Sequence, residues 1–189
     1  MKSYKTVFWF LLACSCSKPK ETVPKTYLLR SSGSISVKND IVFVDNQAYN
    51  GFLVELSPTH DTLALEGYYK GKLSGLYKKW YPNKQLREER NYLNGQKHGK
   101  QVSYWENGTK RFEFMAVNDA YEGELKEWSQ NGKLYHLGTY VKGQEEGPQK
   151  MWYDNGKIRA NYVIIKGKRY GLLGTKNCKN VSDSIFVVK

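Results

Sequence analysis

The sequence lacks the short motifs that mark most enzymes and metal proteins. No serine nucleophile elbow, phosphate-binding loop or dinucleotide-binding fingerprint occurs in it. His60, His98 and His136 have no Cys or second His at metal-ligand spacing, so we expect them at the surface or in turns. Glu88 and Glu89 are adjacent on a predicted strand and therefore point to opposite faces, which rules out a facing acid–base couple. We predict a non-enzymatic protein without catalytic residues, metal or cofactor.

Cysteine is scarce and helical periodicity is absent. The chain has 3 Cys, and the sequence gives no support for a disulfide between Cys16 and Cys178, which lie near opposite ends. No long stretch places apolar residues at the 3.6-residue spacing of a helix. By contrast there are 17 Gly, several in Asn-Gly pairs that mark turns between antiparallel strands, and the chain is 14% aromatic. We therefore predict a folded, all-β protein.

A continuous basic stripe, as expected of a nucleic-acid-binding protein, is also missing. The formal net charge is +12, but its sign alternates along the chain. The net charges are +6 for residues 1–38, −5 for 39–69, +7 for 70–100, −3 for 101–147 and +7 for 148–189. This alternation argues against nucleic acid as a partner. The two later basic blocks leave adhesion to anionic lipid headgroups open.

The first residues have the layout of an export signal. Met1–Lys5 is short and basic, and an apolar run that is too short to cross a bilayer permanently follows over Val7–Ala13. Leu11-Leu12-Ala13-Cys14 resembles a bacterial lipobox, in which the cysteine becomes the acylated first residue. We predict a signal peptide over 1–13, lipidation of Cys14 and a flexible tether over 14–33. The predicted location is the bacterial cell envelope, at the outer membrane rather than the inner, facing the periplasm or the surface.

The most informative feature present is a period of 24 residues. The glycines of one register step by 24 without a gap: Gly75, Gly99, Gly123, Gly147 and Gly171. The same step relates three further registers: Trp80, Tyr104, Trp128 and Trp152; Asn83, Asn107, Asn131 and Asn155; and Leu93, Val117, Val141 and Ile165. Registers in phase over more than a hundred residues indicate a tandem repeat.

Each repeat resolves into two strands and two turns. In the repeat that begins at Gly75, residues 76–81 and 86–93 are rich in β-formers, with turns after each; Glu145 and Glu146 are expected in such a turn. We predict an elongated antiparallel β-hairpin array with five repeats over 47–171. Caps are expected at both ends: a hairpin over 34–46, and a C-terminal cap over 172–189 with a closing strand at 184–188. The Trp80 and Leu93 registers are expected to be buried between neighbouring repeats.

The repeat unit resembles the MORN repeat in its bacterial variant form. The resemblance is carried by Trp152-Tyr153-Asp154-Asn155-Gly156 and by Gly143-Gln144-Glu145-Glu146-Gly147, with matching stretches at 128–132 and 95–99. It implies a meandering hairpin sheet used for binding or scaffolding, and it implies no catalytic residue. Related bacterial chains are described as antitoxins or as membrane-binding proteins. An exported leader disfavours the antitoxin role, because an anchored envelope protein does not readily meet a cytosolic toxin.

Three binding functions remain open on this sequence. The first is a scaffold for protein partners in the envelope, which regular sheets with Trp, Tyr and Arg anchors would suit. The second is adhesion to anionic lipid, and the third is binding of glycan or peptidoglycan on an aromatic ladder, which needs open Trp faces. The oligomeric state is left open. The candidate binding surface comprises Trp80, Trp105, Trp128, Trp152, Tyr81, Tyr153, Lys78, Lys79, Arg87 and Arg90.

Overall fold

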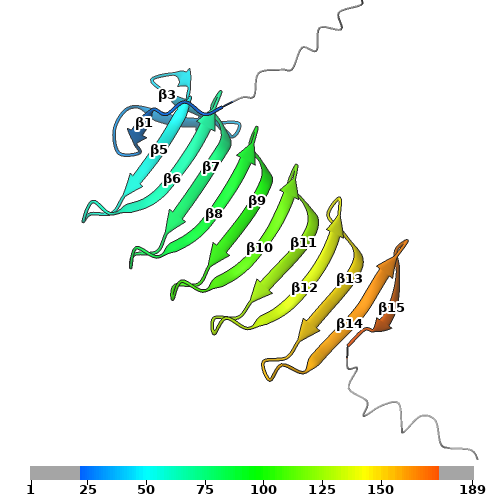
Figure 1. Ribbon diagram of the computed structural model, residues 1–189. Coiled ribbons are helices and arrows are strands. Elements are labelled where there is room, and N and C mark those ends of the chain that lie inside the picture. The colour runs from blue at the N-terminus through cyan, green and yellow to red at the C-terminus, as the bar shows by residue number, and fades with distance from the viewer. Residues whose placement is uncertain (1–21, 175–189) are drawn as a thin grey trace, which may run out of the picture.

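The computed structural model describes residues 22–174, which form two sheets, antiparallel except for the parallel pair of β1 and β5, and contain no helix (Figure 1). The larger sheet has 12 strands in the order β1-β5-β6-β7-β8-β9-β10-β11-β12-β13-β14-β15, and the smaller has the order β2-β3-β4. The strands are β1 (Tyr27–Leu29), β2 (Ile35–Lys38), β3 (Ile41–Val44), β4 (Gln47–Ala48), β5 (Gly51–Leu56), β6 (Thr62–Tyr69), β7 (Lys72–Trp80), β8 (Leu86–Leu93), β9 (Gln96–Tyr104), β10 (Lys110–Val117), β11 (Ala120–Trp128), β12 (Leu134–Val141), β13 (Gln144–Trp152), β14 (Ile158–Ile165) and β15 (Lys168–Leu172). The predicted all-β hairpin array is confirmed.

Strand boundaries follow the 24-residue period. The odd strands β7, β9, β11 and β13 begin at residues 72, 96, 120 and 144, and the even strands β8, β10, β12 and β14 begin at 86, 110, 134 and 158. Consecutive strands pair antiparallel from β5 to β15, so the chain simply meanders across the sheet (Figure 1). The prediction of a turn at Glu145 and Glu146 is wrong, because both lie in β13, after the tight turn at Lys142-Gly143.

Tight turns at one edge of the sheet carry another set of glycines at the 24-residue step: Gly71, Gly95, Gly143 and Gly167, with Asp119 at the position between Gly95 and Gly143. Lys142 and Gly143 both have positive φ, 51° and 81°, and Asn118 and Asp119 follow the same pattern at 51° and 67°. Two successive positive φ values define the type I′ turn, whose twist matches that of a hairpin. Asp119 therefore replaces glycine in this register, because Asn and Asp tolerate the left-handed conformation better than other side chains.

Gly75, Gly99, Gly123 and Gly147 each mark a bulge, in β7, β9, β11 and β13 respectively. Arg90 pairs with Gln101 and Tyr92 pairs with Lys97, so four residues of β9 span the length that two residues of β8 span. Gly99 lies inside this bulge with φ of 90°. Equivalent register shifts occur between β6 and β7, β10 and β11, and β12 and β13. Bulges bend and twist the strand that carries them, so each repeat adds the same curvature to the sheet.

One face of the sheet, which we call the inner face, carries nearly all of the buried side chains. Directly paired residues point to the same face, so the register defines a continuous inner row across ten strands. That row is Leu53, Glu66, Tyr77, Arg90, Gln101, Phe114, Leu125, Gly138, Gln149 and Tyr162. Seven of its side chains are buried, whereas the corresponding outer row has one buried member, Val102.

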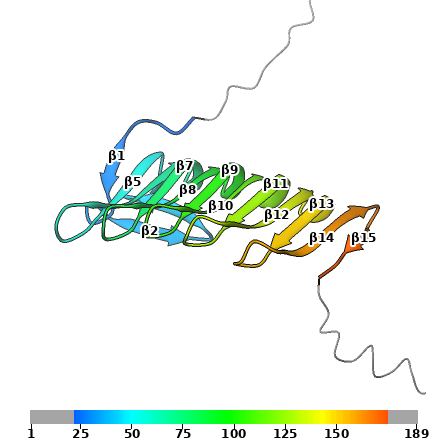
Figure 2. The same ribbon diagram turned by 60° about the horizontal axis from the view of Figure 1, so that its bottom comes forward.

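The three-stranded sheet covers the N-terminal end of the inner face (Figure 2). Val42 of β3 packs with Leu53 and Tyr68 of the large sheet to form a small core. Backbone hydrogen bonds join it to the β6–β7 turn, since Val42 N–H donates to Gly71 O and Gly71 N–H donates to Tyr49 O. Among the described residues no second layer covers the inner face of β8–β15, so its side chains there are shielded chiefly by one another.

Two sequence expectations need correction. Part of the predicted flexible tether is ordered, because β1 pairs in parallel with β5 and Arg30 forms an ion pair with the buried Glu66. The register of Leu93 is not buried between repeats: its four members are 39–51% exposed, since they directly precede the tight turns at the edge of the sheet. The predicted signal peptide, Cys14, Cys16, Cys178 and the strand at 184–188 lie outside the described residues.

Candidate functional site

The ten residues of the predicted binding surface do not form one surface. Lys78 is on the outer face, where its Nζ lies 2.8 Å from Glu89 Oε2, whereas Lys79 and Arg90 are on the inner face. Arg87 is exposed beside Glu88. The remaining six follow the loop edge, at the end of odd strands or in the loop after them: Trp80, Tyr81, Trp105, Trp128, Trp152 and Tyr153.

The aromatic residues of the loop edge serve largely to join neighbouring repeats. All four Trp are half-buried, neither open to solvent nor enclosed. Trp105 Nε1 donates a hydrogen bond to Trp128 O at 2.9 Å, and Tyr81 Oη donates to Tyr104 O at 3.1 Å. Each bond runs from one loop to the next repeat. Two of the Trp rings also contact a cation: the guanidinium of Arg111 lies 4.7 Å from the centre of the Trp105 ring, and Lys110 Nζ lies 5.5 Å from that of Trp128.

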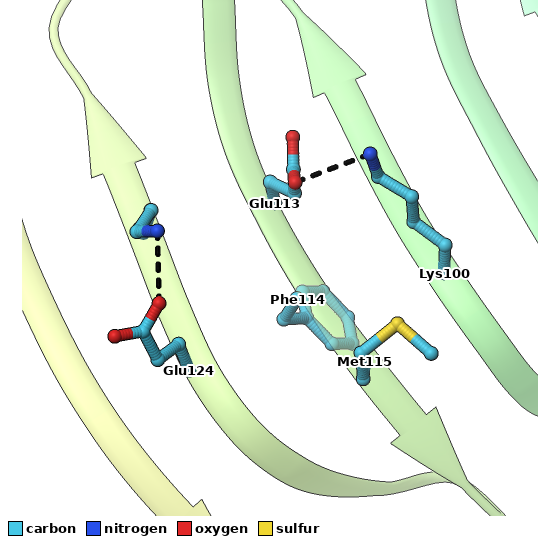
Figure 3. A pocket seen from close by; sticks show the side chains of 6 residues that line it. Lys100, Glu113, Phe114, Met115 and Glu124 are labelled. Carbon is cyan, nitrogen blue, oxygen red and sulfur yellow. Dashed lines mark ion pairs between the residues drawn. The ribbon is translucent and has the colours of Figure 1, made fainter.

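The outer face has a shallow hollow over β9, β10 and β11, lined by Lys100, Glu113, Phe114, Met115, Glu124 and Lys126 (Figure 3). Its charges are paired within the hollow. Lys100 Nζ lies 3.2 Å from Glu113 Oε1, and Lys126 Nζ lies 2.8 Å from Glu124 Oε2, as the dashed lines in Figure 3 mark. Because cations and carboxylates already neutralise each other, this surface offers a charged ligand little.

The inner face carries a chain of aromatic rings across β10, β11 and β12. Ring centres lie 5.6 Å apart for Phe112 and Phe114, 4.6 Å for Phe114 and Tyr121, and 5.2 Å for Tyr121 and Tyr140. The guanidinium of Arg90 caps this chain, 5.4 Å from the centre of the Phe112 ring. Tyr121 is 38% exposed, so the chain of rings reaches solvent. Aromatic and arginine side chains supply most of the binding energy at protein interfaces.

Polar side chains converge beside these rings, over Gly138. His136 Nδ1 lies 2.8 Å from Glu127 Oε2, and Glu127 pairs directly with His136 across β11 and β12. A Cβ built at Gly138 would lie 2.6 Å from Gln149 Oε1, 2.9 Å from Tyr140 Cε2 and 3.2 Å from His136 Nε2. The absence of a side chain at Gly138 therefore lets three neighbours close over the strand. His136 is buried rather than at the surface, contrary to the sequence expectation.

The raised pKa of the Tyr140 phenol reflects the negative charge near this cluster. Burial, together with the carboxylates of Glu145 and Glu127, raises the pKa of Tyr140 to about 12. Burial and Glu145 also raise the pKa of Tyr162. Both shifts follow from the cost of placing a phenolate in a desolvated site near existing negative charge.

Sequence reasoning missed this inner cluster. Its members share no register with one another, so the search for repeated residues passed over them. Strand alternation combined with the 24-residue phase would have placed Phe114, Glu127, His136, Tyr140 and Gln149 on one face.

Residues 22–174 contain no group of three or more His, Cys, Asp or Glu that could hold a metal ion, and no helix able to span a bilayer.

Comparison with known protein families identifies the repeat unit. The MORN repeat variant matches four segments, residues 73–94, 97–118, 121–142 and 145–162. Each begins one or two residues into an odd strand, and the first three end at the last residue of the following even strand or one residue beyond it. No curated protein matches the chain. MORN repeats often act as modules that bind membranes or proteins, and they are generally non-catalytic. Residues 73–162 are thus a tandem of four segments similar to the MORN repeat variant.

Proposed function

We propose that this chain is a non-enzymatic envelope lipoprotein whose inner face binds a protein partner. One observation carries the choice of a protein. The turn and loop positions that build the fold repeat in each unit, whereas the inner face is only partly periodic: Tyr68, Tyr92 and Tyr140 recur on it, but other inner positions vary. At one inner position the five repeats carry five different residues: Glu66, Arg90, Phe114, Gly138 and Tyr162.

A ligand that repeats would select the same side chain in each repeat. Polysaccharides and membrane surfaces present equivalent groups at regular intervals, whereas a protein surface is aperiodic. The inner face also combines an aromatic chain, one arginine cap and half-exposed carboxylates, which is the composition of a protein-binding anchor region. These features support a protein as the partner.

The distribution of basic residues supports lipid adhesion less well. In the block 70–100, Lys78 faces outward and Lys79 and Arg90 face inward, while Lys70 and Lys84 lie at opposite turn edges. A flat anionic surface would contact only one of these groups at a time. Glycan binding on the Trp register is likewise weakened, because the half-buried Trp rings join neighbouring repeats.

Site-specific photo-crosslinking in cells tests the proposal. A photoreactive residue at Tyr121 reports on the inner face, and one at Lys126 reports on the outer face of the same strand. We expect a single adduct of defined mass from position 121 and none from 126. The purified partner should then bind the full-length protein in one-to-one stoichiometry. Equal adducts from both positions, or binding only to anionic vesicles or peptidoglycan, would contradict a protein-binding inner face.

The lipid anchor is tested separately. Metabolic labelling with an alkyne fatty acid should modify the wild-type protein and the control variant Cys16→Ser, but not Cys14→Ser. Cys14→Ser should also move from the membrane fraction to the soluble fraction. No labelling of the wild-type protein would remove the anchor from the proposal, and labelling that persists in Cys14→Ser would place the acyl chain on another residue. Both results leave the inner face untouched.

A further inference from the structure

The cluster over Gly138 contains two buried polar atoms without a hydrogen-bond partner among the described residues. Gln149 is 0% exposed and its Nε2 donates to Thr139 O at 2.7 Å, but its Oε1 is unpaired. His136 is 9% exposed and its Nε2 is unpaired. A buried unsatisfied polar atom costs about 1–3 kcal/mol, so two in one place call for an explanation.

Both unpaired atoms are acceptors when the histidine ring is neutral. The Glu127 carboxylate accepts from His136 Nδ1–H, which leaves Nε2 with a lone pair. Gln149 Oε1 is an amide oxygen and has no proton to give. Both atoms lie beside Gly138, where even a Cβ would stand 2.6 Å from Gln149 Oε1 and 3.2 Å from His136 Nε2. A ligand group therefore reaches them when the side chains of Tyr140 and His136, which close over Gly138, move aside. A hydrogen-bond donor is the missing complement.

The surroundings favour a donor that is also positively charged. The Glu127 side chain is 32% exposed and the Glu145 side chain is 26% exposed. Tyr140 lies close enough to both carboxylates for them to hold its proton more tightly. The rings of Phe114, Tyr121 and Tyr140 add negative π-faces. Glu145 itself pairs with Arg169 at 3.1 Å, whereas the ion-pair partner of Glu127 is His136.

The fold already places its own guanidinium groups in such a setting on either side of this cluster. Arg169 lies 5.5 Å from the centre of the Tyr162 ring while it binds Glu145. Arg90 lies over Phe112 while its Nε binds Glu88 Oε2 at 2.8 Å. In both cases the cation combines an aromatic face with a carboxylate of the inner face. In the intervening stretch around Gly138, no lysine or arginine of residues 22–174 forms an ion pair with Glu127 or stacks on the rings of Tyr121 and Tyr140.

We propose that the inner face of β11–β14 accepts a lysine or arginine side chain of the protein partner, held by Glu127, Gln149 Oε1, His136 Nε2 and the rings of Tyr121 and Tyr140. This rests on the proposed function and specifies the chemistry of its partner. The cation enters beside Tyr121, whose exposed ring marks the open side of the cluster. Its N–H groups then satisfy acceptors that the chain leaves unpaired.

The test uses three capped tripeptides, Gly-Arg-Gly, Gly-Lys-Gly and Gly-Gln-Gly, titrated into the full-length protein and followed by amide NMR. We expect the amide signals of Gly138, Tyr140 and Gln149 to shift with the two cationic peptides and not with the glutamine peptide. Glu127→Gln should weaken binding about tenfold, because it removes a charge-assisted interaction. The matched control Glu124→Gln changes the same charge on the outer face of β11 and should leave the affinity unchanged.

Three results would overturn the cation site. The first is no shift with any peptide, which would assign the unpaired acceptors to ordered water alone. The others are equal shifts with all three peptides, or equal loss of peptide affinity in Glu127→Gln and Glu124→Gln. The crosslink from Tyr121 separates this failure from failure of the proposed function. If the adduct persists while the peptides do not bind, the protein-binding face stands and only its cation specificity falls. If the adduct is also absent, both fall.

Discussion

Single residues on the inner face deviate most from the repeat, and Tyr140 shows the energetic consequence. Its folded-state pKa of about 12 lies above the ordinary value of 10.0, so the folded protein favours the neutral phenol. The resulting stabilisation is fully present below about pH 10 and is lost as the pH rises from about 10 through 12. Tyr140→Phe cannot ionise. We therefore expect its free energy of unfolding to fall less steeply over this window than that of the wild-type protein.

Urea unfolding at about pH 9 and about pH 11.5 measures the difference. Tyr170→Phe, which removes a 52% exposed phenol on the edge strand β15, controls for the loss of one hydroxyl. A Tyr140→Phe variant that loses stability with pH as steeply as the wild-type protein would show that the carboxylates do not act on this phenol.

At the residue scale, the sequence predicted those residues whose type is set by the backbone conformation. It did not predict those whose type is set by packing against neighbouring side chains. The turn glycines and asparagines could be located, because positive φ restricts the residue type regardless of tertiary contacts. Gly138 has the opposite cause. Its φ is not positive, and it is small because Gln149, Tyr140 and His136 close over it. No single sequence shows such a contact, since it depends on β12 and β13 being paired in register.

At the scale of elements, loop asparagines connect one hairpin to the next. Asn107 Oδ1 accepts from Thr109 N–H within its loop, and its Nδ2 donates to Gln130 O of the next loop at 2.8 Å. Asn131 makes the same local bond to Lys133 N–H, but among the described residues its Nδ2 reaches no following loop. We expect Asn107→Ala to cost about 0.5–1.5 kcal/mol more stability than Asn131→Ala, which is the net worth of one hydrogen bond. Chemical denaturation of both variants measures this, and equal losses would show that the loops are energetically independent.

The docking of the small sheet is a second property of elements. Gly71 and Gly167 occupy equivalent tight turns with φ of 75° and 74°. A Cβ at Gly71 would lie 2.4 Å from Ile41 Cγ2 and 2.7 Å from Val42 O, whereas a Cβ at Gly167 would meet nothing within 4 Å. Substitution by Ala should cost each turn about 1–2 kcal/mol for its left-handed backbone. Gly71→Ala should lose a further 1–3 kcal/mol, roughly, because the small sheet must move away.

Thermal or urea unfolding of the two Ala variants tests the docking directly, since they share the backbone strain and differ only in the contact. Equal losses would mean that the small sheet contributes nothing to stability. The sequence predicted this hairpin at 35–44 but not its placement. It was expected as a cap of the array, and the structure places it as a separate sheet over Leu53 and Tyr68. Apolar strands alone do not specify which face they will cover.

At the scale of the whole molecule, the regular turns and loops and the irregular inner face have separate physical origins. Each repeat contacts only its neighbours, so the same glycines, asparagines and loop aromatics recur wherever a turn or an inter-repeat contact recurs. The inner side chains are less constrained, since packing on a single-layer sheet limits their size rather than their type: Tyr68, Tyr92 and Tyr140 recur, but Glu66, Arg90 and Phe114 do not. Periodicity therefore predicted the fold almost completely and said little about the binding face.

This separation predicts that one whole repeat can be added without loss of the fold but with loss of the partner. A second copy of residues 120–143 placed after residue 143 keeps every strand in phase, so cooperative unfolding and β-type circular dichroism should persist. It moves the ring chain of Phe112 and Phe114 away from Tyr162 by roughly 9.6 Å, the width of two strands. A partner protein that contacts both the Phe112–Phe114 rings and Tyr162 should then bind at least tenfold more weakly. A control copy of residues 144–167 placed after residue 167 adds the same length but leaves the order of side chains from β7 to β14 intact, and should retain binding. If both insertions bind like the wild-type protein, the ligand reads a single repeat or a repeating surface, because only such a ligand tolerates a shift by one period.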